Sequence, residues 1–297
     1  MVHRQAVLLL VLLPATVGRA ETEPPPPSAT RIDEAIERGV EWVLDARRPA
    51  GTWASGSRAF GHTALALFAL LHAGIDGEEQ RRVAQSYAWF DAHGPGRRSR
   101  AEPDAATYDV ALALLLLRDR GRPADRDRMQ RLAACLEASQ AENGQWSYEG
   151  EAAGRRPRAG DNSNTQFAVL ALGAAVGEGL EVGAPILRRA LDWWTVSPQP
   201  DGGYGYASGG SRASASTGSM TAAGIASLGI LAESGTTTSP ERVRRAREAA
   251  IRRLALDFQV DRNFGPPQGG AKQRQRNAGR GWTHYFLWSV ERAMVLA

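Results

Sequence analysis

The sequence predicts an all-α protein whose helices form two concentric layers, one inner and one outer. Helical periodicity dominates from Arg31 onward, and no run alternates convincingly as a strand would. A block of residues also recurs along the chain: a polar helix end turns through a glycine onto an aromatic residue, and an apolar helix follows. Such repeated helix pairs predict the architecture, because each pair buries its apolar face against neighbouring pairs.

The recurring block is strongest between Gln140 and Trp146, with Gly144 at the turn and an apolar helix starting at Asn164. Weaker copies lie at 51–53 and 202–204. Glycine permits such a turn at low steric cost, and the aromatic ring can cover the outer end of a helix pair. We therefore assign a structural role first, and ligand contact second, to Trp53, Gln140, Gly144, Trp146, Gly202 and Tyr204.

Two kinds of helix alternate along the chain. One kind is amphipathic and charged, which is typical of a helix in an outer layer; these helices are expected at 32–46, 79–93, 126–140, 183–196 and 241–258. The other kind is rich in alanine, leucine and other small residues and is typical of buried helices. These inner helices are expected at 63–72, 107–118, 164–176, 219–232 and 283–296.

The connections between these helices are unequal. Inner-to-outer links are short, whereas outer-to-inner links are long and rich in Gly, Ser and Arg, at 94–102, 147–161, 207–216 and 265–280. Because successive helices alternate in direction, the long links and the N-termini of the inner helices should share one rim, where function is expected.

Arginines in these long links could attract an anion to the rim. The alternative is that most of them are solvated loop residues. They are Arg97, Arg98, Arg155, Arg156, Arg158, Arg274, Arg276 and Arg280.

The N-terminus reads as a secretory signal peptide. Residues 1–20 combine a basic start, a short apolar run and a small residue at the end, and a proline-rich linker at 21–29 separates them from a domain at 30–297. The chain has a single cysteine, Cys135, so neither a disulfide framework nor a thiolate metal cluster is expected. Together these features favour export to a bacterial periplasm or cell surface, with no transmembrane segment in the mature chain.

The charge balance argues against a nucleic-acid partner. Without Arg4 and Arg19 of the predicted leader, 34 basic residues stand against 32 acidic ones, so the mature chain is close to neutral. No continuous basic face is evident in the sequence, and a nucleic-acid-binding surface would require one.

The run Gln140-x-x-x-Gly144-x-Trp146 resembles the QW repeat of squalene–hopene cyclases and their relatives. The start of the following apolar helix, from Asp161 to Leu172, is similar to the inner-helix start common in that superfamily, which also contains the β subunits of protein prenyltransferases. The resemblance covers nearly all of residues 30–297. It implies an α/α toroid, and it implies that Gln140 stacks on the aromatic residue and bonds to neighbouring backbone.

The catalytic motifs of this superfamily are missing from the sequence. No two aspartates are adjacent, so neither Asp-x-Asp-Asp nor the metal-binding Asp-Asp-x-x-Asp is present. His284 begins an inner helix much as the zinc histidine of prenyltransferases does, but the matching Asp-x-Cys near Ser219–Thr221 is missing. Cys135 is expected on an outer helix, and the Cys-Gly-Glu-Gln thioester of complement-type toroids is absent. We therefore predict no metal and no cofactor.

A functional centre, if the toroid has one, should be lined by the first turns of the inner helices and by the loop above them. His62 and His284 could each move a proton there, or could simply cap and pack. Asp161 and Asn164 could equally be helix N-cap residues. The candidate lining residues are His62, Tyr108, Asp109, Asp161, Asn164, Gln166, Tyr204, Tyr206, Thr221, Trp282, His284 and Tyr285.

Three functions remain open from the sequence. The preferred hypothesis is an exported, non-catalytic toroid that binds a ligand, anionic or apolar, or a protein partner at the loop-rich rim. The second is an isoprenoid-handling enzyme with a divergent site. The third is a polysaccharide lyase or glycosidase that uses a central cleft.

Only five helix pairs are visible in the sequence, whereas a closed toroid of this superfamily usually needs six. The ring could therefore be open, the N-terminal segment could complete it, or the chain could be a fragment.

Overall fold

The computed structural model describes residues 27–97, 105–148, 158–207, 214–235, 239–265 and 282–296. The chain divides into two compact units, Met1–Gly39 and Val40–Ala297. In the first unit the described residues begin helix α1 (Ala29–Asp45). The predicted signal peptide at 1–20 and most of the proline-rich linker lie outside the described residues. Among the residues that the structure describes, no helix is long and apolar enough to cross a membrane.

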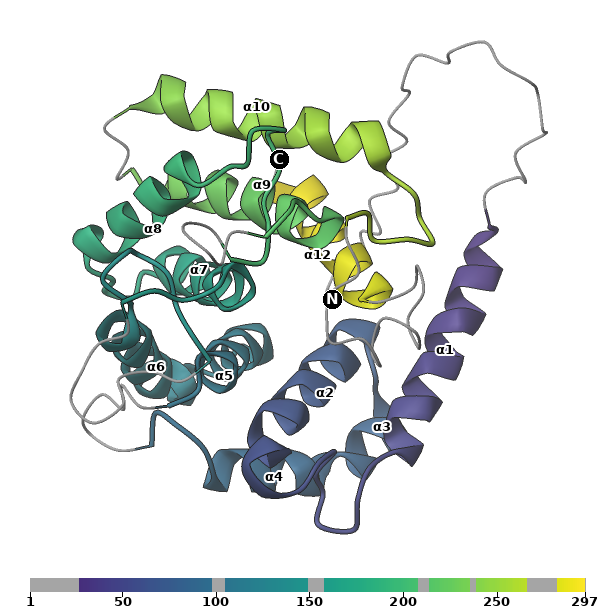
Figure 1. Ribbon diagram of the computed structural model, residues 1–297. Helices are drawn as coiled ribbons and strands as arrows, with labels where there is room; N and C mark the ends of the chain where they lie inside the picture. The colour runs from purple at the N-terminus through teal and green to yellow at the C-terminus, as the bar shows by residue number, and fades with distance from the viewer. Residues whose placement is uncertain are drawn as a thin grey trace. The chain divides into compact units, whose positions relative to one another are not determined.

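The second unit is helical, as predicted, and its described residues contain two isolated β-bridges and no strand. Figure 1 shows its helices lying in two layers. The inner layer comprises α2 (Ala59–Ala73), α5 (Thr107–Arg120), α7 (Asn162–Gly177), α9 (Gly218–Glu233) and α12 (Thr283–Leu296). The outer layer comprises α4 (Ala84–Ala92), α6 (Arg126–Ser139), α8 (Ala184–Val196) and α10 (Pro240–Asp257).

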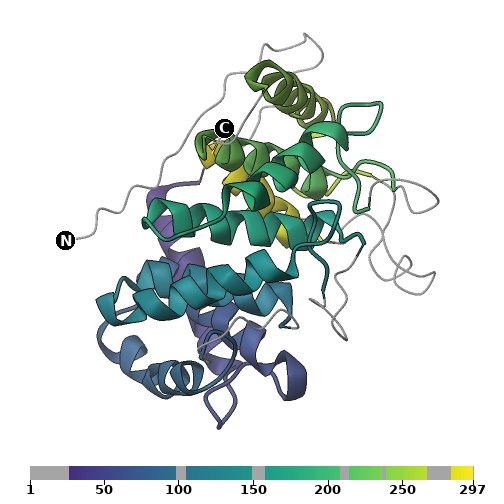
Figure 2. The same cartoon turned by 90° about the vertical axis from the view of Figure 1, so that its left-hand side faces the viewer.

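The inner helices pack in chain order, with α2 against α5, α5 against α7, α7 against α9, and α9 against α12. The two views agree that α5, α7 and α9 lie side by side (Figures 1 and 2). Along α7 and α9 most positions are buried on every side of the helix. The small residues of these helices permit this, because alanine and glycine let neighbouring backbones approach closely.

Each outer helix buries only one face. Helix α6 packs against α5 and α7, α8 packs against α9 and α7, and α10 packs mainly on α9. The buried positions of α10 follow a helical spacing, at Val243, Ala246, Ala250 and Leu254. This pattern confirms the assignment of the charged, amphipathic helices to an outer layer.

One predicted outer helix is wrong in detail. The segment expected as a single helix at 79–93 is two helices, α3 (Gly77–Arg82) and α4, which meet at Val83. The backbone of Val83 has φ −97° and ψ 0°, outside the α-helical region, while its side chain is completely buried. Burial of this valine in the core therefore accompanies a break that helical periodicity alone does not reveal.

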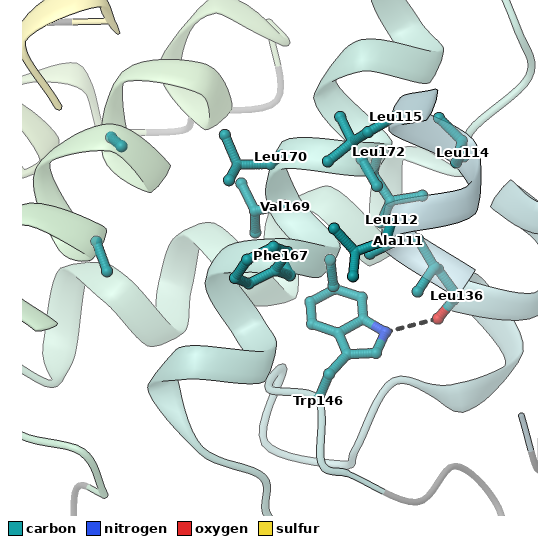
Figure 3. Close-up of a cluster of buried hydrophobic side chains, with 14 of the residues drawn as sticks. Ala111, Leu112, Leu114, Leu115, Leu136, Trp146, Phe167, Val169, Leu170 and Leu172 are labelled. Atoms are coloured by element: carbon teal, nitrogen blue, oxygen red, sulfur yellow. Dashed lines mark hydrogen bonds between the residues drawn. The ribbon is translucent and has the colours of Figure 1, made fainter. Parts of the chain in front are cut away.

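The recurring turn has the same aromatic hydrogen bond in three helix pairs. In each, the polar tip of the aromatic side chain donates to the backbone carbonyl ten residues earlier, near the end of the preceding outer helix. Figure 3 shows the bond made by Trp146, whose indole is fully buried. The three bonds are Trp53 Nε1 to Val43 O at 2.6 Å, Trp146 Nε1 to Leu136 O at 2.7 Å, and Tyr204 Oη to Trp194 O at 2.6 Å.

A threonine on the inner helix completes the same unit. The backbone N–H of each aromatic residue donates to a threonine hydroxyl, which ties the turn to the inner helix of its own pair. The acceptors are Thr63 at 3.4 Å from Trp53, Thr165 at 3.1 Å from Trp146, and Thr221 at 3.1 Å from Tyr204.

The turn glycines have positive φ angles and lie against the next helix pair. Gly51, Gly144 and Gly202 have φ of +80°, +89° and +83°, a region that disfavours any side chain. A Cβ on Gly144 would collide with the backbone carbonyl of Arg189 on α8. The three turns therefore allow close contact between successive pairs, which a residue with a side chain would prevent.

Gln140 joins two helix pairs from a fully buried position. Its Nε2 donates to the carbonyls of Gly144 at 3.1 Å and Ile186 at 2.9 Å, and its Oε1 accepts from Arg189 Nε at 2.9 Å. All of its polar atoms are thereby engaged within the turn and by α8.

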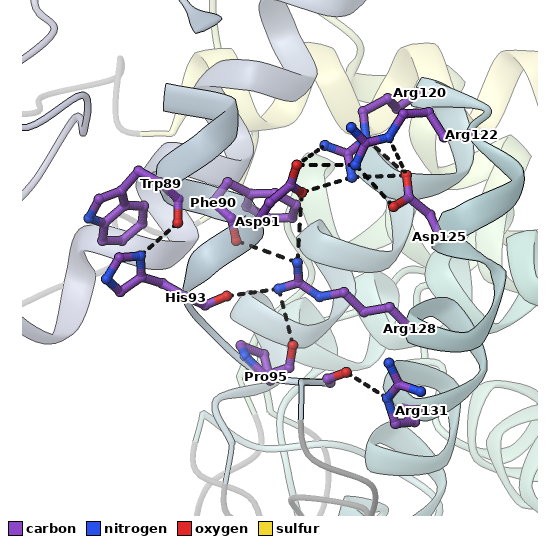
Figure 4. Close-up of polar contacts among 11 residues, drawn as sticks. Trp89, Phe90, Asp91, His93, Pro95, Arg120, Arg122, Asp125, Arg128 and Arg131 are labelled. Carbon is purple, nitrogen blue, oxygen red and sulfur yellow. Dashed lines mark hydrogen bonds and ion pairs between the residues drawn. The ribbon is translucent and has the colours of Figure 1, made fainter. Parts of the chain in front are cut away.

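A partly buried ion network links α4, the C-terminal end of α5 and the start of α6 (Figure 4). Asp91 accepts from Arg120 at 2.9 Å and from Arg122 at 3.1 Å, and Asp125 lies 2.9 Å from Arg120. The guanidinium groups lower the pKa of Asp91 against the opposing effect of its burial. The side chains of Arg120 and Asp125 are both nearly inaccessible, and each has a second partner of opposite charge, Asp91 for Arg120 and Arg122 for Asp125.

Arg128 on α6 supports the end of α4 in the same region. Its guanidinium lies 4.8 Å from the ring centroid of Phe90 and donates to three backbone carbonyls, one in the last turn of α4 and two just beyond it (Figure 4). Burial lowers the pKa of Arg128 to about 10. The acceptors are the carbonyls of Phe90 at 3.4 Å, His93 at 2.8 Å and Pro95 at 3.3 Å.

Candidate functional site

The N-termini of three inner helices are each bonded to the loop that precedes the next inner helix. These links join successive pairs along one rim, where the long connections were expected. They are Thr107 Oγ1 to Ser147 O at 2.7 Å, Asn162 N to Tyr206 O at 3.0 Å, and Gly218 N to Phe264 O at 3.0 Å. The rim therefore places loop side chains directly over the inner-helix N-termini.

Six aromatic side chains converge at this rim, and we call them the aromatic strip. Tyr108 of α5 contacts Phe167 of α7 with ring centroids 4.7 Å apart, and Phe167 stacks on Trp288 of α12 at 4.9 Å and 13°. Rings from segments far apart in sequence thus form one continuous surface. Its members are Tyr108, Tyr148, Phe167, Tyr206, Tyr285 and Trp288.

The exposure of the strip differs along its length. Phe167 at its centre is buried, and its neighbours Tyr108, Tyr206, Tyr285 and Trp288 are half-buried. Tyr148 keeps 56% of its surface accessible. The strip is therefore supported from below by the inner helices and open to solvent on its loop side.

Phenolic hydroxyls make the surface of the strip polar. Tyr206 Oη donates to Tyr148 Oη at 3.0 Å, and Tyr285 Oη donates to Gln166 Oε1 at 2.6 Å. Burial raises the pKa of Tyr108, Tyr206 and Tyr285 well above the ordinary value. These phenols are therefore neutral hydrogen-bonding groups at physiological pH, not phenolate bases.

Asp161 caps helix α7 beneath the strip. Its Oδ1 accepts from the backbone N–H groups of Ser163 and Asn164, both at 3.0 Å, and from Ser163 Oγ at 2.6 Å. Its Oδ2 accepts from Asn164 Nδ2 at 2.8 Å. Both carboxylate oxygens are thus engaged by the first turn of the helix, so the structure places Asp161 in the N-cap role that was one of its two predicted roles.

Asp109 is the candidate acid with the most unusual surroundings. It lies on α5 against the backbone of Gly61 on α2, where a Cβ on Gly61 would collide with its carboxylate. Burial raises the pKa of Asp109 to about 6, and the nearby His62 partly opposes the rise. No described residue donates a hydrogen bond to this carboxyl group, which explains why burial dominates its pKa.

Replacing Asp109 by Asn should stabilise the protein at neutral pH by about 2 kcal/mol, allowing for its partial exposure. Because the pKa of Asp109 is higher in the folded state, the folded wild type binds more protons than the unfolded chain between pH 4 and 6. Its stability therefore falls as pH rises through that window and levels off above it. Urea unfolding of both proteins from pH 4 to 7.5 would measure the difference.

In that experiment the Asp109→Asn profile should be flatter, and the two proteins should converge near pH 4. Asp192→Asn, which makes the same substitution at an exposed position on α8, is the matched control. Equal pH dependence in wild type and Asp109→Asn would contradict the raised pKa.

The other predicted lining residues occupy different places. Tyr204 and Thr221 belong to the buried turn described above. His62 is exposed, with its Nδ1 2.9 Å from the carbonyl of Arg58. His284 is exposed at the start of α12, and Trp282 precedes that helix with a φ of +65° and 57% of its surface accessible. The two histidines are therefore solvent-facing.

Gln166 and Asn164 are completely buried on α7. Gln166 bonds to Tyr285 of the aromatic strip, whereas Asn164 uses its amide nitrogen on Asp161. The Oδ1 atom of Asn164 has no hydrogen-bond partner among the residues that the structure describes.

Most of the rim arginines lie outside the part of the chain that the structure describes. Arg98, Arg155, Arg156, Arg274, Arg276 and Arg280 lie outside the described residues, whereas Arg97 and Arg158 are exposed. Cys135 is buried on α6, and the described ranges contain no group of three His, Cys, Asp or Glu side chains that could hold a metal ion.

Sequence reasoning missed three residues of the rim. Tyr148 follows Trp146 by two positions and Trp288 follows Tyr285 by three. Both therefore lie close in sequence to residues that the pattern had selected. Asn162 joins two pairs through Oδ1, which accepts from Gln145 at 3.1 Å and Trp193 at 2.8 Å, and through Nδ2, which donates to Gly205 at 2.8 Å. No local sequence signal distinguishes it from an ordinary first-turn asparagine.

Comparison with known proteins identifies the fold. No protein-family model matches the chain, and no curated protein matches it in sequence. Among solved structures, a polysaccharide lyase is similar with a TM-score of 0.58 and 13% identity, over 89% of this chain and 85% of that one.

Two cyclases are also similar in structure. The ent-copalyl diphosphate synthase from Streptomyces platensis has a TM-score of 0.54 and 17% identity, over 90% of this chain and 46% of its own. A type II terpene cyclase from Scytonema, in complex with geranylgeranyl dihydroxybenzoate, has a TM-score of 0.52 and 20% identity, over 78% and 65%. The chain spans less than two thirds of each cyclase. At these identities the likeness shows the shared α/α toroid fold alone.

Proposed function

We propose that this α/α toroid is an exported, non-catalytic protein that binds a ligand on the aromatic strip at its rim. One observation carries the proposal: six aromatic side chains from three inner helices and two loops converge at the rim, and four of them are tyrosines that add hydroxyl groups. Aromatic surfaces with a few placed polar groups are typical of ligand sites, and the helices beneath supply a rigid support.

The chemistry of the strip favours binding over catalysis. Its phenols are neutral, and the carboxylate beneath it, Asp161, is engaged by the N-terminus of α7. A general acid or base must be able to exchange a proton with the substrate, and a carboxylate held by four hydrogen bonds in a helix cap is poorly suited to this.

Export is supported by the pattern of residues 1–20, which combines a basic start with a short apolar run. N-terminal sequencing of the protein recovered from its native host would test this part of the proposal. A mature chain beginning at Glu21 is the expected result, and an intact Met1 in the cytoplasm would contradict it.

The ligand-binding proposal is tested with a panel of glycans and lipids, probed with wild type, Tyr148→Ala and Trp42→Ala. Tyr148 lies in the strip and Trp42 lies outside it on α1; both are more than half exposed, so neither substitution should disturb folding. We expect a ligand whose binding weakens about tenfold in Tyr148→Ala and is unchanged in Trp42→Ala. Equal binding by all three proteins would place the site elsewhere.

Liquid chromatography with mass spectrometry of the ligand after incubation separates binding from catalysis. A binding protein should leave both the mass and the retention time of the ligand unchanged, whereas a cyclisation would change the retention time alone.

Asp109 favours a second candidate, an enzyme that uses this carboxyl group as an acid. Its raised pKa keeps a fraction of it protonated close to neutral pH. The similar solved structures include a polysaccharide lyase and terpene cyclases, so a glycan or an isoprenoid are the substrates to test. A product formed by wild type and lost in Asp109→Asn would replace the binding proposal with this one.

A further inference from the structure

The aromatic strip combines flat ring faces with hydrogen-bonding groups at their edges. Resting on the proposed binding function, we infer that its ligand is a glycan, bound with pyranose rings against the aromatic faces and sugar hydroxyls on the phenols. The competing ligand, a prenyl chain, has apolar faces but no hydroxyls. The inference follows from how the polar atoms of the strip are arranged.

The ring faces suit a flat, extended ligand. Phe167, Tyr285 and Trp288 lie nearly parallel, with interplanar angles of 12°, 13° and 24° and centroids 4.9 to 6.4 Å apart. Phe167 is buried between its stacked neighbours, so the ring area open to a ligand is that of the exposed Tyr148 and of the half-buried members of the strip. The C–H face of a pyranose ring is apolar and about as wide as one such side chain, so a sugar can pack on this accessible area. This feature alone would also suit a prenyl chain.

The hydroxyls distinguish the two ligands. Tyr206 and Tyr148 bond to each other through their Oη atoms, which leaves one phenolic proton and further acceptor sites for a partner. A prenyl chain covering these groups would displace their water and supply no replacement, which weakens binding by roughly tenfold for each unsatisfied group. Sugar hydroxyls donate and accept, so they replace the displaced water.

The charge of the strip also fits a polyhydroxylated ligand. None of its six members is a charged residue, and Tyr285 bonds to the neutral amide of the buried Gln166. Asp161 beneath them has both oxygens engaged by α7. Among the residues that the structure describes, the strip therefore offers a ligand hydroxyl groups and aromatic rings.

The test compares oligosaccharides with an isoprenoid on variants that lose a hydroxyl and keep the ring. Calorimetry with hexasaccharides of glucose, xylose and galacturonic acid, and flotation with phosphatidylcholine vesicles containing geranylgeraniol, would be run on the full chain, Tyr206→Phe and Tyr148→Phe. Tyr87→Phe on α4 is the matched control, since it removes a half-buried hydroxyl outside the strip.

We expect at least one hexasaccharide to bind, with affinity about fivefold weaker in each strip variant and unchanged in Tyr87→Phe. Geranylgeraniol binding that the two strip variants preserve or strengthen would overturn the glycan inference and leave the proposed binding function standing. If no probe binds, or if binding is unaffected by Tyr148→Ala as well, both the glycan inference and the proposed binding function are wrong. Thermal unfolding of each variant confirms that it is folded.

Discussion

Trp146→Ala is expected to lower the free energy of unfolding by about 4 to 5 kcal/mol. The indole is completely buried in the cluster of Figure 3, and its Nε1 donates at 2.7 Å to the carbonyl of Leu136. Truncation to alanine removes this apolar surface, leaves a cavity between α5, α6 and α7, and strips a buried carbonyl of its donor. Urea unfolding followed by circular dichroism would measure the loss.

Two comparisons isolate the causes of that loss. Trp146→Phe keeps most of the ring but removes the hydrogen bond, so it should cost about 1 to 3 kcal/mol. Trp53→Ala alters the equivalent residue of the first helix pair, which is only half-buried, and should cost less than Trp146→Ala. Equal losses at Trp53 and Trp146 would contradict burial as the dominant cause.

Gly144→Ala is expected to destabilise the protein by about 3 kcal/mol. Its φ of +89° is unfavourable for any residue with a Cβ, and that Cβ would collide with the backbone carbonyl of Arg189. Relief of the collision requires α8 to move away from the turn, which would disturb the two hydrogen bonds that Gln140 makes to α8. The same urea titration measures the effect.

Gly121→Ala is the matched control for the backbone conformation. Gly121 ends α5 with a φ of +67°, and a Cβ there would meet no atom within 4 Å. It should cost about 1 kcal/mol, the conformational part of the penalty alone. If the two alanine variants lose equal stability, contact between the turn and α8 is not what selects glycine at 144.

The layers of this fold were predictable because the signals that specify them are local. Apolar positions around α7 and α9 mark helices buried on all sides, and the charged face of α10 marks an outer helix. The break at Val83 was missed since a two-helix segment retains the same overall pattern of apolar residues.

The candidate site was predictable only in part. The pattern selected Tyr108 and Tyr285 because each lies near the start of an inner helix, and Tyr206 because it belongs to the loop above them. It missed Tyr148 and Trp288, whose places depend on which rings meet when the helices pack. Asp161 illustrates the opposite outcome, since its position suggested both a lining residue and a helix cap, and its hydrogen bonds put it in the cap.

The sequence by itself determined the helix pairs, their division into two layers and the turns that join them. These features depend on periodicity and on near neighbours in the chain, so a single sequence contains the information. Only the tertiary structure decided that the aromatic side chains form one strip and that Asp109 lies against Gly61. Gln166 and Tyr285, for example, are 119 residues apart and meet because α7 and α12 pack in the same layer. Contacts of that kind depend on how whole helices pack, and no local pattern specifies them.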